Sequence, residues 1–452
     1  MSTVSQRISV ASRLDRVPLS GYHHKILGII ALGEWFDMYD LYMISYVAAA
    51  LLSTHFLSPS QFTAYISAGF VGMFVGCIIL GWLGDRFGRR TLFTFNLLWY
   101  SIFTILGALS PNATLMIVAR ALAGLGMGAE FIIVDTYLGE MIPAKARGRY
   151  IIYAYTIAFT AAPIVAFLSY FIVPHTWGLP GWRWIMLIGG IGALAVWPIR
   201  LALPETPRWL ESKGRTAEAD ALVTQIENDI QRASSQPLPP VTQDVTVPVS
   251  AGVPISELVH RPYGGRMGMM MLLQFLQSIA YFGFASWAPT FLLKEGFSLV
   301  HALFYTALIA LFIPIGSLIG ALLAERFERK WQIAILSLAI AAVGLAFSLA
   351  HVPWLIVVTG AALSLLNNWF SPAIHAYQAE IFPTRLRSTA GGFAYSWSRL
   401  SAAISAFVIA AVLFGWGVFG VFVVISAFMV IIAAEMIWAP KTNERPLEEI
   451  AS

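Results

Sequence analysis

Charged side chains are scarce in this sequence. Asp, Glu, Lys and Arg make up 12% of its 452 residues, whereas 58% of the residues are hydrophobic and the mean hydropathy is +0.73. Soluble domains carry about 25% charged and about 45–50% apolar residues, so a soluble protein of this composition would need an implausibly large core. Apolar runs of about 20 residues recur, and short alternating strands do not. The sequence therefore predicts a polytopic, all-α membrane protein.

Cysteine and the common catalytic motifs are also rare or missing. The single cysteine, Cys77, excludes an intrachain disulfide and a cysteine-rich metal site. No Walker loop is present, so we expect that ATP does not drive the protein. The GLGMG run at 124–128 lies inside an apolar segment rather than after a strand, which argues against a dinucleotide site. We expect no enzyme activity, cofactor, metal site or nucleic-acid partner.

Twelve apolar segments are long enough to cross a membrane, and they fall into two sets of six. The first set lies near 26–52, 61–83, 91–109, 113–138, 150–172 and 183–203. The second set lies near 267–292, 300–323, 332–350, 354–379, 388–412 and 417–438. The predicted domains are a tail (1–25), a six-helix bundle (26–203), a central loop with an amphipathic helix at 215–232 (204–266), a second six-helix bundle (267–438) and a tail (439–452).

The basic residues predict the orientation. If both termini are cytoplasmic, the outer segments keep only Arg183 and Lys294, as the positive-inside rule requires. Arg120 and Arg399 are the basic residues assigned to the interior of spans. Residues 1–25 contain no short apolar stretch that ends at a cleavage site, so they read as a cytoplasmic tail. We expect a monomer in a bacterial inner membrane.

The two sets of spans repeat at a single offset. Residues 84–90 (GDRFGRR) correspond to 324–330 (AERFERK), 240 positions later. The same offset relates Glu140, Pro143 and Arg147 to Glu380, Pro383 and Arg387. Two pseudo-symmetric, parallel halves with a site between them near the membrane midplane are a transporter architecture.

The segment GWLGDRFGRR (81–90) joins two predicted spans on the inner side. Its glycines permit tight turns and close helix approach. Asp85 can accept hydrogen bonds from a helix N-terminus, and the arginines can pair with carboxylates at neighbouring helix ends. Such a cluster can hold the cytoplasmic face closed. The structural alternative is a tight turn whose charges only set the topology.

Four spaced segments resemble signatures of the major facilitator superfamily. GWLGDRFGRR (81–90) is similar to the loop signature of the superfamily. The segments RALAGLGMGAE…GEMIPAKARGR (120–149), LPETPRWLESKGR (203–215) and AEIFPTRLRS (379–388) resemble signatures of its sugar and general-metabolite branch. The resemblance covers the whole chain and implies a transporter of twelve helices. The second loop departs from the pattern, because Glu325 and Glu328 stand where the first loop has aspartate and glycine.

A cytoplasmic gate is predicted where these loops meet the ends of the fourth and tenth spans. Glu140 with Arg147, and Glu380 with Arg387, are expected to form ion pairs across helix ends. The other predicted gate residues are Asp85, Arg89, Glu325 and Arg329. Surface ion pairs contribute little to stability, but pairs that are remade in alternate states can bias a conformational equilibrium. A fixed interfacial pair is the alternative.

Ionisable residues inside spans are functional candidates, because charge is costly in a membrane. Asp40 lies about 21 Å above the start of the first span, and Arg120 lies about 10 Å below the outer start of the fourth. In a core of about 30 Å the two residues share nearly one depth, so we expect them to pair. The resemblance implies that this aspartate and arginine couple proton binding to transport. A static, charge-neutralised pair is the alternative.

Four further acidic residues lie in the same two spans. Glu34 and Asp37 share a drifting face of the first span with Asp40. Asp37 is a rival proton carrier, whereas Glu34 and Asp135 are expected near the inner vestibule or gate. Glu130 resembles the acidic residue that follows the glycines in metabolite–proton symporters. That resemblance implies a role in coupling or cation contact, with a packing hydrogen bond as the alternative.

Arg399 is the candidate for binding the substrate. It lies about 16 Å into the eleventh span, close to the midplane. A lone arginine at this depth favours a carboxylate or an anionic substrate, and no acidic residue is visible at mid-depth in the second half. The alternatives are a partner from the first half and a buried hydrogen-bonding hub.

The other candidate substrate residues are aromatic or carry amides. The span-seven stretch SIAYFGFASWAPTFL (278–292) resembles the niacin and organic-ion subgroup. Aromatic rings can stack on a planar ligand, and amides or a histidine can donate hydrogen bonds to it. The full set is Gln277, Tyr281, Trp287, Asn367, Asn368, Trp369, His375 and Arg399. Ordinary packing is the alternative for each aromatic residue, and a buried structural histidine is the alternative for His375.

A hexose is disfavoured as the substrate. Leu276, Phe282 and Ala162 stand where hexose transporters of this family place amides. Each sugar hydroxyl left unpaired in a buried site is costly.

These features predict a proton-coupled symporter that works by alternating access. Its substrate would be a small organic anion, such as an aromatic or nicotinate-like carboxylate. Its partners would be that substrate, protons and the lipid bilayer. A sugar or polyol porter and an organic cation or zwitterion porter are alternatives, and a transporter-like substrate sensor is the alternative from another class.

Overall fold

The computed structural model describes residues 10–128, 130–234, 237–241, 263–323, 327–382 and 387–442. Within them the fold is helical, apart from one antiparallel pair of two-residue strands, β1 (Thr176–Trp177) and β2 (Leu179–Pro180). The helices of the first half are α2 (Gly21–Ser53), α3 (Pro59–Phe87), α4 (Arg89–Ala108), α5 (Ala113–Met127), α6 (Glu130–Met141), α7 (Ala144–Phe159), α8 (Ala161–Ile172) and α9 (Gly181–Arg200).

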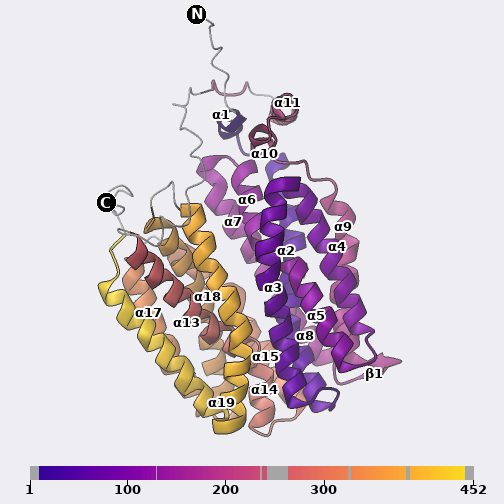
Figure 1. Ribbon diagram of the computed structural model, residues 1–452, viewed down its shortest axis with the longest axis vertical. Helices are drawn as coiled ribbons and strands as arrows, with labels where there is room; N and C mark the ends of the chain where they lie inside the picture. Colours follow the sequence, from indigo (N-terminus) through magenta and orange to yellow (C-terminus); the bar gives the residue numbers. More distant parts are fainter. Residues whose placement is uncertain are drawn as a thin grey trace, which may run out of the picture.

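The helices of the second half form a separate group. They are α13 (Gly264–Ala285), α14 (Ala288–Lys294), α15 (Leu299–Ala310), α16 (Phe312–Leu323), α17 (Arg329–Ser348), α18 (Pro353–Glu380) and α19 (Arg387–Trp438). The two groups stand side by side in Figure 1, with the first in indigo to magenta and the second in orange to yellow. Because α19 bends at Gly417, whose φ is 73°, it runs as two consecutive segments.

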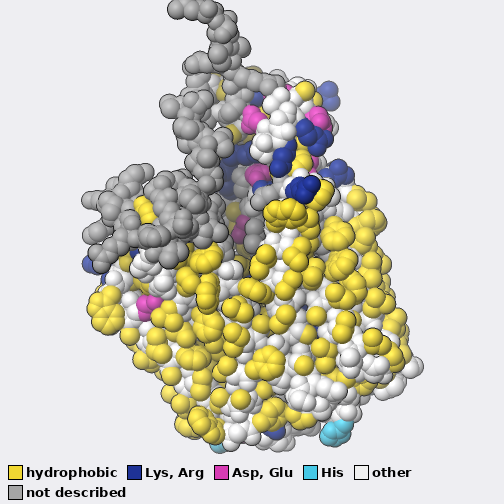
Figure 2. Space-filling model, viewed as in Figure 1, with side chains coloured by type: hydrophobic (Ala, Val, Ile, Leu, Met, Phe, Trp, Pro, Cys, Tyr) yellow, Lys and Arg dark blue, Asp and Glu magenta, His cyan; other side chains and the backbone are white. Residues whose placement is uncertain are grey.

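Three short helices cover one end of the first group, which we call the polar end. They are α1 (Val10–Asp15), α10 (Pro207–Ser212) and the predicted amphipathic helix α11 (Thr216–Ser234). Figure 2 shows that hydrophobic side chains cover most of the flank of the molecule, whereas charged side chains gather near these helices. An apolar flank with a polar end is the surface expected of a chain that crosses a bilayer.

Nine helices in the described part of the chain are long and apolar enough to cross a membrane. They correspond to ten of the predicted spans, because the last two are joined in α19. The span predicted at 26–52 is not among them, although α2 is a 33-residue helix that contains three carboxylates. The span predicted at 113–138 is divided into α5 and α6. The multi-pass helical class is confirmed, and the count of twelve stays a prediction.

Four of the predicted spans are divided into two consecutive helices. These are α5 and α6, α7 and α8, α13 and α14, and α15 and α16. In three of them a proline lies in the first turn of the second helix: Pro163, Pro289 and Pro314. Proline lacks the N–H that would continue the ladder of hydrogen bonds, and its ring collides with the preceding turn. The position of a proline therefore explains three of these four breaks.

The 240-residue repeat is visible in the packing of both halves. A Cβ atom placed on Gly76 of α3 would lie 2.1 Å from the carbonyl oxygen of Leu125 of α5. A Cβ atom on Gly316 of α16 would lie 2.4 Å from the carbonyl oxygen of Leu365 of α18. In each half a glycine lets two helix backbones touch, as small residues do in membranes. The two contacts lie at the same positions of the repeat.

Hydrogen bonds that involve charged side chains connect α1 and the residues after it to the polar end. Glu227 of α11 accepts hydrogen bonds from Arg13 at 2.7 Å and from Arg16 at 2.8 Å. Asp15 accepts a hydrogen bond of 2.9 Å from the backbone N–H of Ala144, the first residue of α7. Burial opposes the charge of Glu227, but the bonds to the two arginines outweigh it and hold the pKa of Glu227 below its ordinary value.

The docking of α1 is therefore expected to depend on pH. Because the pKa of Glu227 is depressed, its contribution is fully present above the unfolded pKa of about 4.3 and is lost as the pH falls through the folded pKa. Hydrogen–deuterium exchange of residues 10–16, corrected for intrinsic rates, should rise between about pH 5 and about pH 3. Glu227→Gln should give fast exchange at every pH. Glu218→Gln is the matched control, because Glu218 pairs with Arg215 and not with α1; an unchanged pH profile in Glu227→Gln would contradict the assignment.

Candidate functional site

The predicted pair of Asp40 and Arg120 is present inside the first half. Nη1 of Arg120 on α5 donates a hydrogen bond of 2.5 Å to Oδ2 of Asp40 on α2. The hydroxyl of Thr104 on α4 donates to Oδ1 of Asp40 at 3.0 Å. Asp40 is 1% exposed and Arg120 is 3% exposed. Both carboxylate oxygens are thus satisfied within the group of helices, and the pairing that depth arithmetic predicted is confirmed.

A second buried charge cluster lies one turn away on α2. The carboxyl groups of Glu34, Asp37 and Glu130, which we call the acidic cluster, have oxygens within 4.8 Å of one another. Nη2 of Arg200 lies 2.5 Å from Oε1 of Glu130 and 3.6 Å from Oδ2 of Asp37. Arg200 also donates a hydrogen bond of 2.7 Å to the carbonyl oxygen of Phe93. The structure therefore brings Asp37 and Glu130 together around a guanidinium group.

Arg200 was not foreseen by sequence reasoning. Only Arg120 and Arg399 were expected inside spans, and Arg200 was expected among the inner segments, yet Arg200 is 0% exposed at the end of α9. A signal was present, because the predicted span 183–203 contains this residue. Three carboxylates in the first span against one expected arginine also required another buried cation. Glu34 lies within this cluster, and Asp135 instead accepts a hydrogen bond from Tyr155 of α7 at 3.0 Å.

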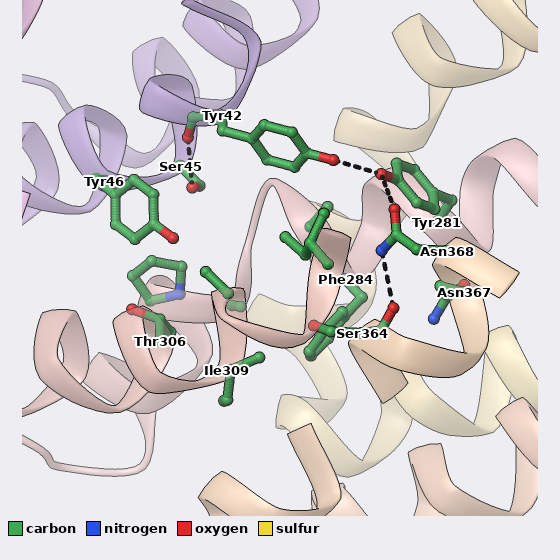
Figure 3. Close-up of a pocket in the computed structure, with 15 residues that line it drawn as sticks. Tyr42, Ser45, Tyr46, Tyr281, Phe284, Thr306, Ile309, Ser364, Asn367 and Asn368 are labelled. Carbon is green, nitrogen blue, oxygen red and sulfur yellow. Dashed lines mark hydrogen bonds between the residues drawn. The ribbon is translucent and has the colours of Figure 1, made fainter. Parts of the chain in front are cut away.

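A small pocket lies between the two halves. Its volume is about 40 Å³. Figure 3 shows Tyr42 of α2 pointing across it toward Tyr281 of α13, and their hydroxyls are 2.8 Å apart. Tyr281 also donates to Oδ1 of Asn368 at 3.5 Å. The lining residues with polar side chains are Tyr42, Ser45, Tyr46, Tyr281, Thr306, Ser364, Asn367 and Asn368.

Three of the predicted substrate residues line this pocket, namely Tyr281, Asn367 and Asn368. The amide nitrogens of both asparagines donate to carbonyl oxygens one turn earlier on α18, at 2.9 Å for Asn367 and 2.8 Å for Asn368. Sequence reasoning missed the contribution of α2, where Tyr42 and Tyr46 are one turn apart. Their position just beyond Asp40 on the same helix was the available signal.

Arg399 and His375 lie in a second group rather than in that pocket. Arg399 is 3% exposed and donates a hydrogen bond of 2.7 Å to the hydroxyl of Tyr395, one turn earlier on α19. The rings of His375 and Tyr395 have centroids 5.7 Å apart. Arg399 is also in electrostatic contact with Cys77 of α3 and Glu34 of α2. It therefore faces the first half, at the boundary between the two groups of helices.

The remaining candidate substrate residues lie in packed surroundings. Trp287 is 0% exposed, and its ring centroid is 4.9 Å from that of Phe62. Trp369 packs beside Gly320 of α16. Gln277 donates a hydrogen bond of 3.1 Å to Gln274 of the same helix. None of the three is among the residues that line the pocket between the halves in the described part of the chain.

The predicted gate pair of Glu140 and Arg147 is wrong. Arg147 instead lies 3.6 Å from Asp15, whereas Glu140 lies 3.7 Å from Arg89 and accepts a hydrogen bond from the hydroxyl of Thr206. Arg147 lies in the first turn of α7, and Asp15 caps that end of the helix, so the two form the nearer pair.

The second gate pair follows the first at the offset of the repeat. Arg329 pairs with Glu380 at 2.7 Å, 240 positions after Arg89 and Glu140. The arginine of each loop motif thus pairs with the glutamate that sequence reasoning had assigned to Arg147 or Arg387. Glu325 lies outside the described residues, as do the side chains of Asp85 and Arg387.

Two helical groups with broken helices, buried ion pairs and a pocket at their boundary define a multi-pass membrane transporter. The sequence model of the sugar (and other) transporter family matches residues 25–452. The niacin transporter NiaP of Acinetobacter baylyi is 30% identical over 98% of this chain and 100% of its own length. The gallate transporter of Pseudomonas putida is 26% identical over 91% of this chain and 90% of its own length.

A solved structure has the same fold. The proton:xylose symporter XylE of Escherichia coli, a member of the major facilitator superfamily, superposes with a TM-score of 0.71 at 20% identity, over 95% of this chain and 98% of that chain. The chain belongs to the sugar (and other) transporter family. It is a transporter and not an enzyme.

The place of Arg200 in the acidic cluster can be tested through Gly33. A Cβ atom on Gly33 would lie 2.0 Å from Nη2 of Arg200, so Gly33→Ala must push the guanidinium group away from its carboxylates. Overpacking of this kind costs about 1–3 kcal/mol, and we expect the thermal midpoint of the purified protein in detergent to fall. Gly28→Ala on the same helix is the matched control, because a Cβ atom there meets nothing within 4 Å. Equal midpoints for the two variants would argue against the packing described here.

Proposed function

We propose that this transporter is a proton-coupled symporter of a small organic anion, with an aromatic carboxylate as the substrate class. The observation that carries the proposal is the buried Arg399, which faces the first half beside the rings of Tyr395 and His375. A guanidinium group binds a carboxylate through two parallel hydrogen bonds, and neighbouring aromatic rings suit a planar ligand. The protein would act as a monomer in a bacterial inner membrane, with both termini cytoplasmic.

Coupling to protons is assigned to Asp40 and Arg120. An ionised Asp40 binds Arg120 through a charge-assisted hydrogen bond, whereas a neutral Asp40 would leave the guanidinium group free to rearrange. Protonation would therefore favour one arrangement of the helices over another, because the two arrangements bind the proton differently. XylE, which has this fold, is a proton symporter. Its name supports the coupling mechanism for this chain.

The names of two relatives support the substrate class. Niacin and gallate are both small aromatic compounds that carry a carboxyl group, and their transporters match nearly the whole chain. The pocket between the halves, at about 40 Å³, is far smaller than the roughly 300 Å³ of a typical small ligand site. Substrate entry would therefore require the halves to separate, with the pairs Arg89–Glu140 and Arg329–Glu380 breaking and re-forming as the gate.

Proton coupling and substrate class can be measured together in proteoliposomes. We would impose an inward proton gradient and record internal pH while adding nicotinate, an aliphatic acid, xylose or an organic amine. Nicotinate should trigger proton influx into wild-type vesicles. Arg399→Ala should lose the response, because the carboxylate has no guanidinium partner, by about ten- to a hundred-fold for a loss of about 1.4–3 kcal/mol. Asp40→Asn should lose proton influx but keep nicotinate exchange at equal pH.

The other responses separate the alternatives. If xylose or the amine triggers proton influx and Arg399→Ala has no effect, the substrate is a sugar or a cation rather than an organic anion. Proton coupling would still hold in that case. Nicotinate uptake without proton flux would remove the coupling. Arg215→Ala is the control for loss of a surface arginine, because Arg215 pairs with Glu218 at the exposed polar end.

A further inference from the structure

We propose that the acidic cluster and Arg200 form a second proton-binding site, separate from the pair of Asp40 and Arg120. The inference deepens the proposed function, since it rests on the same coupling to protons. The two sites have different partners: Asp40 is satisfied by Arg120 and Thr104, whereas Arg200 serves the cluster. The transporter would thus carry two buried sites of protonation within its first half.

The charge of the cluster is the first argument. Glu34, Asp37 and Glu130 are at most 1% exposed, and Arg200 is 0% exposed. With every carboxyl group ionised, three negative charges would face Arg200 within the cluster and Arg399 from the second half, in a volume shielded from water. Burying an unpaired charge costs several kcal/mol, and carboxylates that share a site avoid this cost by retaining a proton. At least one carboxyl group of the cluster is therefore neutral in the folded protein.

Carboxyl oxygens that accept no hydrogen bond indicate where a proton would be bound. Among the described residues, no donor forms a hydrogen bond with either oxygen of Glu34, either oxygen of Asp37 or Oε2 of Glu130, although Arg200 lies 3.6 Å from Asp37. The carboxyl groups of Asp37 and Glu130 nevertheless lie within hydrogen-bonding range of each other. Two carboxylates cannot bond, because each only accepts, but a protonated carboxyl group donates. One proton between Asp37 and Glu130 turns a repulsive contact into a hydrogen bond.

A buried hydroxyl group is the independent sign of a ligand at this place. Tyr100 of α4 is 1% exposed, and its hydroxyl has no hydrogen-bond partner among the described residues. It is in electrostatic contact with Asp37, Arg200, Asp40 and Glu130, of which Asp40 already has its own donors in Arg120 and Thr104. Buried hydroxyls almost always have a partner, so this one is positioned to donate to whichever carboxylate is ionised.

The second half supplies an internal comparison. The repeat offset of 240 leads from Glu34 and Asp37 to Gln274 and Gln277. There Gln277 donates to Gln274 at 3.1 Å, and Gln274 donates to Gln378 at 2.8 Å. Amides both donate and accept, so this chain of bonds is satisfied without any proton from outside. A protonated carboxyl group can likewise both donate and accept a hydrogen bond. An ionised carboxylate only accepts, so Glu34 and Asp37 cannot form such a chain of bonds unless one of them holds a proton.

A proton fits the cluster better than a metal cation does. Hard cations such as Ca²⁺ take about 6–8 oxygen ligands, and the cluster offers three carboxyl groups. The guanidinium group of Arg200 lies 2.5 Å from Glu130 and already places a positive charge among them. The absence of a metal site stays a prediction, and shared protons are the occupant that we propose for the three carboxyl groups.

The titratable and charged groups around the cluster come from six helices. They are Asp40 on α2, Tyr100 on α4, Asp135 on α6, Tyr155 on α7, Arg200 on α9, and Tyr395 and Arg399 on α19. Arg399 is thus the charged residue of the second half that acts on Glu34. Glu130 lies on α6. Release of the proton would therefore change the electrostatic environment of the candidate substrate residue Arg399.

Infrared spectroscopy of the full chain in lipid membranes tests this proposal without requiring transport. In sodium-free buffer near neutral pH, the wild-type protein should show a C=O band of protonated carboxyl groups that shifts in D₂O and disappears reversibly as the pH is raised. Asp37→Asn and Glu130→Gln should each remove a component of this band. Asp40→Asn should keep that component, and so should Glu227→Gln, which removes a carboxylate at the polar end.

Other outcomes would overturn either this site or the function on which it rests. A wild-type spectrum without the band, or a band unchanged in Asp37→Asn and Glu130→Gln, would exclude a proton at the cluster. Loss of the band on adding NaCl at constant pH would assign the cluster to a sodium ion. If either variant fails to fold, Glu34→Gln and Tyr100→Phe should still shift the band, and no shift would count against the site. Absence of proton-coupled transport with the band present would refute the proposed function and leave this site standing.

Discussion

Charge neutralisation inside an apolar environment is the constraint on which the first half of this protein depends. Each buried carboxylate or guanidinium group costs several kcal/mol unless a partner compensates it. Arg120 compensates Asp40, and Arg200 compensates Glu130 and approaches Asp37. These buried ion pairs link α2 to the three helices α5, α6 and α9. Removal of any single partner leaves the other charge buried. The same constraint makes these groups suitable for coupling, because adding a proton changes which partners are needed.

The repeat shows which features serve the shared architecture and which serve one half alone. The glycine contacts of Gly76 and Gly316 recur at an offset of 240, and so do the loop pairs that end at Glu140 and Glu380. The buried carboxylates of Glu34 and Asp37 do not recur, since the second half has Gln274 and Gln277 at the corresponding positions. The packing contacts are therefore duplicated, whereas the carboxylates at these two positions occur in the first half.

Sequence reasoning reached the helical transporter fold because apolar length and basic residues are local signals. It also found the partners Asp40 and Arg120, since depth along two helices follows from residue counting. It failed for Glu140 and Arg147, because the pairing at helix ends depends on the approach of α1, whose Asp15 takes Arg147. It missed Arg200, because an arginine at the end of a span is equally consistent with a loop. Depth along a helix is encoded locally, whereas the neighbours of a side chain are not.

The candidate substrate residues divide into two groups, and their separation constrains how a transport cycle could proceed. Tyr281 and Asn368 meet Tyr42 of the first half across the pocket, and the two tyrosine hydroxyls are 2.8 Å apart. Arg399 meets the first half elsewhere, where Cys77 and Glu34 approach it. A ligand that binds Arg399 would therefore replace contacts between the halves at that point, while the tyrosine contact closes the pocket. Separation of the two halves at the pocket would break the hydrogen bond between Tyr42 and Tyr281. Contacts with the substrate would then have to replace the free energy of that bond.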